Sequence, residues 1–205
     1  MFTVIESNKS KNALIIGNGA SRKNINLNLN DYSTIFACNA YYRDNPNSSF
    51  DYLVSIDEKI SKEIRDSDVP HEKIIQPPFE EQFEHPEYCK LTNTRFRSNA
   101  GMNCLMEAIK KTFKKIYIVG FDFLINSDLA LSNLYDGSDC YGPDTRANAN
   151  DNLNRVKYFI WFVQTHVYVD FVICYPRIKD LEIFTIPGDN VSGIYLDELE
   201  NKLKE

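Results

Sequence analysis

A glycine-rich segment with polar side chains follows the first apolar run of the chain. It reads Gly17-Asn18-Gly19, with Ser21 two residues later. Glycines let a backbone approach a ligand closely and adopt positive φ, which leaves N–H groups free to face an anion. The spacing is not the Rossmann G-x-G-x-x-G, because Arg22 stands where the third glycine belongs, and no Gly-Lys-Ser/Thr follows as in a Walker A loop. We predict a phosphate-binding turn here, with a plain strand-to-helix turn as the alternative.

A second polar block runs from Arg97 to Gly101 and stands directly before a segment of helical period. Ser98 or Asn99 can cap that helix. Gly101 falls in its first turn, where unpaired N–H groups and the positive end of the helix dipole favour anions. Arg97 beside this end would complete a phosphate site. The alternative is simple capping next to a surface arginine.

Polar residues also follow other apolar runs, namely Asn39, Asp57 and Asp122. Ligands of parallel sheets bind beyond the carboxyl ends of the strands, so we expect these side chains to share one rim with the glycine turn. A metal site is not predicted, because the three histidines lie far apart and no Cys/His pairs have ligand spacing.

The elements that carry these residues alternate between apolar runs and helix-period segments, the pattern of an α/β domain with a largely parallel, Rossmann-like sheet. The predicted strands are Ala13–Ile16, Thr34–Cys38, Tyr52–Ser55, Lys73–Gln76, Lys115–Val119 and Tyr168–Cys174. The predicted helices lie near Glu58–Arg65, along the apolar stripe from Met102 to Phe113, from about Asn152 to Thr165, and around Leu196–Leu203. Residues 79–97 are expected to be irregular.

The segment 124–150 is dense in Asn, Asp, Gly and Ser and is too long for an ordinary connection. Long connections of this kind are usually lids or binding loops. We predict a lid over the predicted phosphate-binding turn that is poorly packed when empty, within one domain spanning residues 1–205.

Composition narrows the class of protein. The 205 residues are 43% hydrophobic and 25% charged, with a formal net charge of −6. A protein that binds nucleic acid by broad phosphate neutralisation should be basic, so nucleic acid is not an expected partner. No apolar run reaches the ~18–20 residues of a membrane span, and no basic segment followed by an apolar one marks a secretory signal. Five cysteines without close pairs favour reduced thiols and a cytoplasmic location.

Four blocks, taken in order, resemble one known family. They are Leu14–Ser21, Phe36–Tyr42, Arg97–Gly101 and Ile116–Phe123. Their order and spacing are similar to those of the bacterial sialyltransferases of glycosyltransferase family 42. The resemblance implies a Rossmann-like domain with a lid that takes a CMP-linked sugar as its donor, without a metal or another cofactor. The second partner would be a glycan acceptor, and peripheral contact with a membrane glycolipid and self-association both stay open.

The resemblance also implies roles for individual residues. Gly17, Asn18, Gly19 and Ser21 would contact the nucleotide phosphate and ribose, and Asn39 the phosphate end of the cytidine nucleotide. The residues from Arg97 onward would line the cleft. The family has two lid tyrosines that donate hydrogen bonds to the leaving phosphate. Leu124 stands where the first would fall, so Tyr135 and Tyr141 become candidates by their place in the lid.

Two positions depart from the family. Asn99 and Ala100 stand where the family has small hydroxyl residues that hold the sialic acid carboxylate. No histidine occurs between residues 86 and 165, where the family has its general base, and Asp151 lies near that place. Asp151 could take the acceptor proton if burial raised its pKa. Alternatively, it is the N-cap of a helix that begins at Asn152.

Two other functions fit the same fold. One is a Mg²⁺-dependent enzyme similar to archaeal pterin diphosphokinases, with Asp57 and Asp122 holding the metal. The other is a protein that binds nucleotide or glycan without catalysis.

Overall fold

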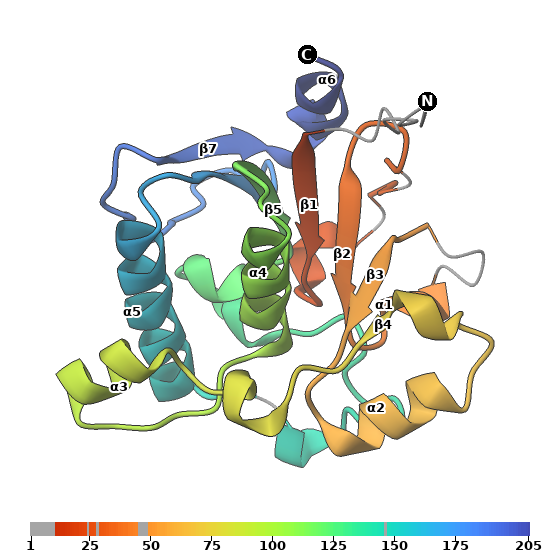
Figure 1. The fold of residues 1–205 in the computed structure, drawn as a ribbon. Coiled ribbons are helices and arrows are strands. Elements are labelled where there is room, and N and C mark those ends of the chain that lie inside the picture. The colour runs from red at the N-terminus through yellow and green to blue at the C-terminus, as the bar shows by residue number, and fades with distance from the viewer. Residues whose placement is uncertain (1–10, 24, 28, 45–48, 146) are drawn as a thin grey trace, which may run out of the picture.

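The described residues form one seven-stranded sheet in which every pair of neighbouring strands is parallel (Figure 1). The structure is a computed structural model that describes residues 11–205 except 24, 28, 45–48 and 146. The strands are β1 Asn12–Ile16, β2 Thr34–Cys38, β3 Tyr52–Val54, β4 Ile74–Ile75, β5 Lys115–Val119, β6 Asp170–Tyr175 and β7 Val191–Tyr195. Their order across the sheet is β4-β3-β2-β1-β5-β6-β7. The chain therefore builds the sheet outward from β1 on one side and from β5 on the other, which confirms the α/β, Rossmann-like fold.

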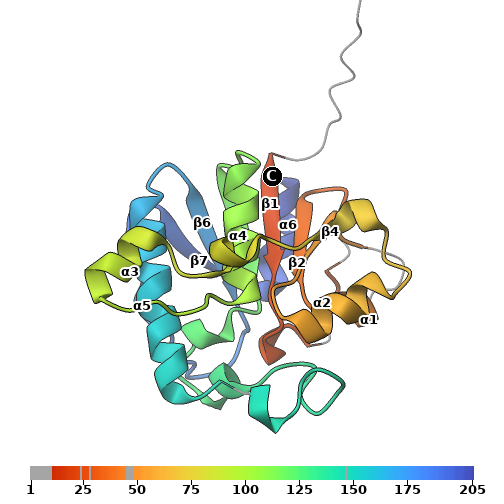
Figure 2. The same ribbon diagram turned by 60° about the horizontal axis from the view of Figure 1, so that its bottom comes forward.

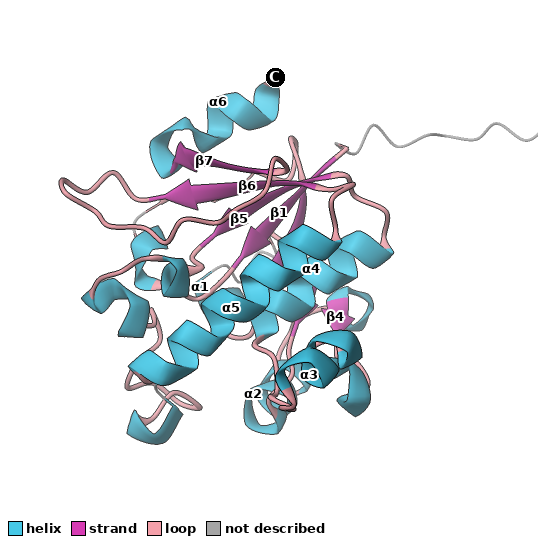
Figure 3. Cartoon of the chain, turned by 90° about the vertical axis from the view of Figure 1, so that its left-hand side faces the viewer, coloured by secondary structure: helices cyan, strands magenta, loops and turns pink. Residues whose placement is uncertain are grey.

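The central strands are buried on both faces, as expected of a parallel sheet. The helices are α1 Tyr41–Asp44, α2 Glu58–Arg65, α3 Pro86–Thr92, α4 Ala100–Lys110, α5 Ala149–Thr165 and α6 Leu199–Lys204. Apolar residues of α4 and α5 pack on one face of the sheet, and those of α1, α2 and α6 pack on the other. Figure 3 shows α4 and α5 side by side on one face and α6 across the sheet from them. The molecule has three layers, with a core on each face of the sheet.

Three elements lie where the sequence did not indicate them, namely β7, α3 and the short helix α1. Strand β7 carries Ser192 and Gly193 and is mostly exposed, so it lacks the apolar run by which the other strands were predicted. Helix α3 falls inside residues 79–97, which we expected to be irregular. It begins with Pro86, and the His85 side chain caps it by accepting a hydrogen bond from the Glu87 N–H at 3.3 Å. Proline suits a first helical position because its missing N–H would have no helical partner there.

Helix α5 begins at Ala149, three residues earlier than predicted. Its N-cap is Asn148, whose side chain accepts a hydrogen bond from the Asp151 N–H at 3.0 Å, and the Asp151 carboxylate accepts one from the Asn148 N–H at 3.3 Å. Asp151 is therefore the third residue of a capping box and not the N-cap, which corrects that expectation.

The segment 124–150 folds against the carboxyl ends of β1 and β2 through short 3-10 turns (Figure 2). The Leu134 N–H donates to the Asn18 carbonyl at 3.0 Å, and Asn133 forms an isolated antiparallel bridge with Gly19. Tyr135 and Tyr141 of this segment are buried in the core that α1 and α2 share. Its predicted mobility in the empty protein stays a prediction. None of the helices in the described ranges is long and apolar enough to cross a membrane.

Candidate functional site

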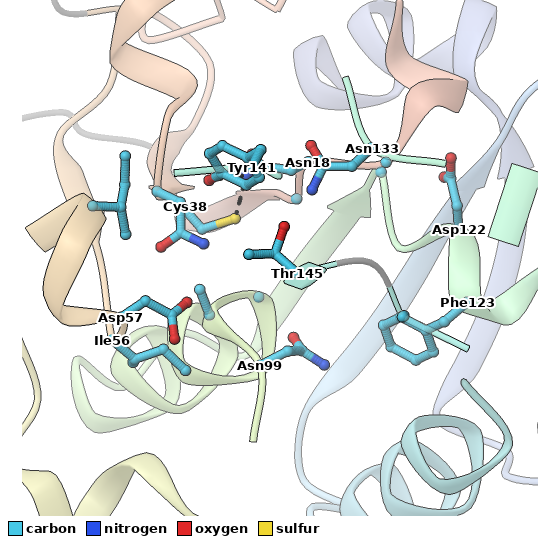
Figure 4. A pocket seen from close by; sticks show the side chains of 18 of the residues that line it. Asn18, Cys38, Ile56, Asp57, Asn99, Asp122, Phe123, Asn133, Tyr141 and Thr145 are labelled. Carbon is cyan, nitrogen blue, oxygen red and sulfur yellow. Dashed lines mark hydrogen bonds between the residues drawn. The ribbon is translucent and has the colours of Figure 1, made fainter. Parts of the chain in front are cut away.

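A cavity of about 640 Å³ lies beyond the carboxyl ends of β1, β2, β3 and β5, where the strand order reverses between β1 and β5 (Figure 4). Ligands of open α/β sheets bind at such a switch point. Ten of the eleven predicted binding residues line the cavity: Gly17, Asn18, Gly19, Asn39, Asp57, Arg97, Ser98, Asn99, Gly101 and Asp122. The fold thus brings together polar segments that are as much as 105 residues apart in the sequence, from Gly17 to Asp122.

The glycine turn packs against the end of β5. The N–H groups of Gly17 and Gly19 donate to the carbonyls of Val119 and Gly120, at 2.8 and 3.0 Å. A Cβ atom at Gly17 would lie 2.5 Å from the Gly120 carbonyl oxygen, and Gly120 itself has φ +71°. These glycines are therefore needed because two turns meet closely.

Asp122 fixes the other side of the glycine turn. Its buried carboxylate accepts hydrogen bonds from the Ser21 N–H at 2.8 Å and from the Ser21 hydroxyl at 2.5 Å. A Cβ atom at Gly19 would collide with this carboxylate. Burial raises the pKa of the Asp122 carboxyl, while the bonds from Ser21 oppose that shift.

The N–H groups of Gly17, Gly19 and Ser21 already have protein acceptors, so they are not free to bind a phosphate. This corrects the expectation that the N–H groups of the glycine turn face an anion. Ser21 is the one predicted binding residue that does not line the cavity.

Asn18 joins the turn to the 124–150 segment. Its amide donates to the Tyr141 hydroxyl oxygen at 3.1 Å, and the Cys38 thiol donates to its carbonyl oxygen at 3.7 Å (Figure 4). Because the Tyr141 oxygen accepts this bond, its own proton is available to a ligand in the cavity. Burial raises the pKa of Tyr141, so the hydroxyl stays neutral. Tyr141 is therefore placed as a neutral hydrogen-bond donor at the cavity wall.

Asn39 and Ser98 line the cavity, and one oxygen of each, Asn39 Oδ1 and Ser98 Oγ, is buried without a hydrogen-bond partner. Asn39 follows β2 and has φ +49°, a left-handed conformation that asparagine tolerates better than most residues. Buried polar atoms are almost always hydrogen-bonded, so each exception calls for an explanation. Because both oxygens are closed off from solvent, a ligand in the cavity reaches them only if the two side chains turn towards it.

The block before α4 is held by side-chain contacts. Arg97 donates to the Ile56 carbonyl, to Gln82 Oε1 at 2.6 Å and to Asp57 Oδ1 at 3.2 Å. Asn99 is the N-cap of α4 and accepts from the Met102 N–H at 3.0 Å. Asn99 therefore caps α4 in the structure, and Arg97 joins residues 97–101 to the segment that follows β3.

The two carboxylates of the magnesium alternative do not meet. Figure 4 shows Asp57 and Asp122 on opposite sides of the cavity. Asp57 pairs with Arg97 and Asp122 accepts from Ser21, so each has a protein partner. Within the described ranges, no three His, Cys, Asp or Glu side chains gather into a group that could hold a metal ion.

The predicted catalytic residues are not brought together. Tyr141 lines the cavity, but Tyr135 lies behind the glycine turn. The Tyr135 hydroxyl donates to Asp44 Oδ2 at 2.6 Å and accepts from Arg22 Nη2 at 2.9 Å. Asp151 is exposed in the capping box of α5 and does not line the cavity.

Two arginines with clear structural places were missed by sequence reasoning. Arg22, at the position of the absent third glycine, is buried beneath the turn and donates to the Gly17 carbonyl at 2.6 Å. Arg155 of α5 lines the cavity. The sequence spacing could have indicated this position, since Arg155 is three residues after Asn152 and four before Phe159, and both of these lie on the buried face of the helix.

The geometry is the evidence on which function must rest. No protein-family model, curated protein or solved structure was found to match this chain.

Proposed function

We propose that this chain binds a nucleotide sugar, with CMP as the nucleotide, and transfers the sugar to a glycan hydroxyl without a metal. The observation that carries the proposal is the cavity at the strand-order reversal, which ten of the eleven predicted binding residues line. Its volume of about 640 Å³ lies within the ~300–1,000 Å³ of typical ligand pockets. The preference for CMP and for an acidic sugar comes from the resemblance to the family 42 sialyltransferases.

The chemistry of transfer makes specific demands on the cavity. The bond between the anomeric carbon and the phosphate oxygen breaks, and CMP leaves with the electron pair. The acceptor oxygen forms the new bond to that carbon and gives up its proton. Negative charge grows on the leaving phosphate, and fixed neutral donors in a site screened from water stabilise it. Tyr141, with its proton available and its pKa raised by burial, has the properties of such a donor.

Proton removal is the step for which the cavity offers least. Asp151 lies outside it, while Asp57 is paired with Arg97 and Asp122 is bonded to Ser21. This observation favours a second candidate function, a protein that binds the nucleotide or glycan and does not catalyse transfer. The two candidates differ in turnover and share the binding site.

A thermal-shift panel tests the binding step. The ligands are CMP, UMP, AMP, GDP and a pterin, each with and without Mg²⁺, because a ligand of the native state raises the unfolding midpoint. We expect CMP to raise the midpoint without Mg²⁺. A shift with the pterin that requires Mg²⁺ would instead favour the diphosphokinase-like function. Incubation with CMP-sialic acid and a glycan then separates transfer from binding alone.

The variant Asn39→Gly locates the site. Glycine tolerates the left-handed backbone at this position, so the substitution removes the amide without adding backbone strain. We expect CMP affinity to fall about tenfold, the effect of losing one or two ligand hydrogen bonds. The matched control is Asn93→Gly, because Asn93 has φ +52° at the end of α3 and does not line the cavity. Equal CMP affinity in both variants would place the nucleotide elsewhere.

A further inference from the structure

Arg155 places a cationic group at the α5 side of the cavity. It lies on the face of α5 that packs towards the protein, is partly buried, and lines the cavity. Its Nη1 donates to Asn152 Oδ1 at 3.1 Å, and the Asn152 amide donates in turn to the Ala130 carbonyl at 2.7 Å. The guanidinium is thus held in place by a neutral side chain that is itself fixed.

The charge of Arg155 has no acidic partner. In the ranges that the structure describes, no carboxylate lies within 4.0 Å of its guanidinium, although Asp151 on the preceding turn attracts it from farther away. Three other arginines differ, of which Arg22 and Arg43 are fully or partly buried and Arg97 is exposed. Arg22 has Asp44 at 3.9 Å and Arg43 has Glu63 at 2.6 Å. Arg97, also at the cavity, has Asp57 at 3.2 Å.

A partly buried cation without a counter-charge is unfavourable in an empty protein, because it has lost water without gaining an ion pair. Burial lowers the pKa of Arg155, yet a guanidinium stays charged in proteins. It carries five N–H donors in a planar fork, and the Asn152 side chain accepts from one of them. The remaining donors suit a two-oxygen anion such as a phosphate or a carboxylate.

We propose that Arg155 binds an anionic group, phosphate or carboxylate, of the molecule that occupies the cavity. The proposal rests on the proposed function for its choice of probes, since a nucleotide linked to an acidic sugar carries both groups. Arg155 would act with Tyr141, whose proton is also available to an anion. It would supply charge that the glycine turn does not, because the N–H groups of Gly17, Gly19 and Ser21 already have protein acceptors.

The test compares Arg155→Gln with the control Lys157→Gln, which removes a charge from an exposed position of the same helix. Calorimetry measures two pairs of ligands that differ in one anionic group. CMP and cytidine differ in the phosphate, and N-acetylneuraminate and its methyl ester differ in the carboxylate. We expect Arg155→Gln to weaken one anion about tenfold or more and to leave its neutral counterpart unchanged. The affected pair identifies which anionic group Arg155 binds.

Two further measurements separate this inference from the proposed function. Pyrophosphate binding, in the parent and in Arg155→Gln, needs no nucleotide recognition. If pyrophosphate binds through Arg155 and no nucleotide binds, the inference stands and the proposed function fails. If CMP binds and Arg155→Gln binds every anion as the parent does, the inference is overturned and the function stands. The unfolding midpoint of Arg155→Gln should equal or exceed that of the parent, because an uncompensated charge is removed. A clear fall would indicate a structural role and overturn the proposal.

Discussion

Glu84 carries a buried carboxyl group outside the cavity. We expect this group to make the free energy of unfolding depend on pH. Glu84 is 6% exposed, and its Oε2 is buried without a hydrogen-bond partner. Tyr88 and Cys89 of α3 and Tyr158 of α5 interact with it electrostatically, and none of them can supply a positive charge. Burial raises the pKa of Glu84 from 4.5 to about 7. The folded protein therefore holds a proton on Glu84 that the unfolded chain releases at lower pH.

The size and sign of the effect follow from this pKa difference. Below pH 4.5 both states are protonated and Glu84 costs nothing. Between 4.5 and about 7 the unfolded state binds fewer protons, so the free energy of unfolding falls as the pH rises. At ~1.36 kcal/mol per pKa unit the full loss is about 3 kcal/mol. Glu84→Gln keeps the shape of the side chain and cannot ionise, so it should remove this loss.

The assay is urea unfolding of the parent, Glu84→Gln and Glu87→Gln, at about pH 5 and about pH 8. Glu87 is exposed in the first turn of α3 and is the matched control. We expect Glu84→Gln to exceed the parent by about 2–3 kcal/mol at the higher pH and to approach it at the lower one. Glu87→Gln should keep the pH dependence of the parent. The reasoning is refuted if Glu84→Gln is no more stable than the parent at the higher pH.

Four further outcomes are expected. Gly17→Ala should lower the free energy of unfolding by about 1–3 kcal/mol in urea, because its Cβ would meet the Gly120 carbonyl. Asn148→Ala should cost about 1 kcal/mol in the same assay through loss of the α5 cap. Asp151→Asn should leave CMP binding unchanged in calorimetry and any turnover unchanged in a transfer assay, because Asp151 is outside the cavity. Lost turnover with retained CMP binding would indicate that Asp151 is the base after all. Segment 124–150 should exchange amide hydrogens faster in the empty protein than with CMP, and slow exchange throughout the empty segment would contradict the predicted lid.

The fold could be predicted from the sequence wherever burial leaves a strong pattern. Strands β1, β2 and β5 are buried over most of their length, so they need continuous apolar runs and were predicted within one residue. Strand β7 lies at the sheet edge with one neighbour, and its exposed positions place no such demand on residue type. Edge strands of this kind give little signal to a single-sequence reading.

The rim of the site was also predictable, because parallel strands bring their carboxyl ends to one edge. The sequence did not show, however, whether each polar group at that rim points into the cavity or towards another part of the protein. Whether the Gly19 N–H faces a ligand depends on Gly120, about a hundred residues later in the chain. The spacing of Arg155 from Asn152 and Phe159 places it on the buried face of α5, but the sequence does not show that this face borders a cavity.

The contacts of the glycine turn determine where a ligand anion can be met. Gly17 and Gly19 donate to the end of β5, and Asp122 accepts from Ser21, so these three amides have acceptors and a carboxylate lies beside the turn. A phosphate placed against it would face repulsion from Asp122 and gain little from the backbone. Tyr141 and Arg155 have side-chain donors open to a ligand, and both residues follow the turn by more than a hundred positions. The proposed anion recognition therefore depends on how the 124–150 segment and α5 are held over the sheet. For that reason, substitutions that loosen this segment should weaken anion binding even where they touch no ligand.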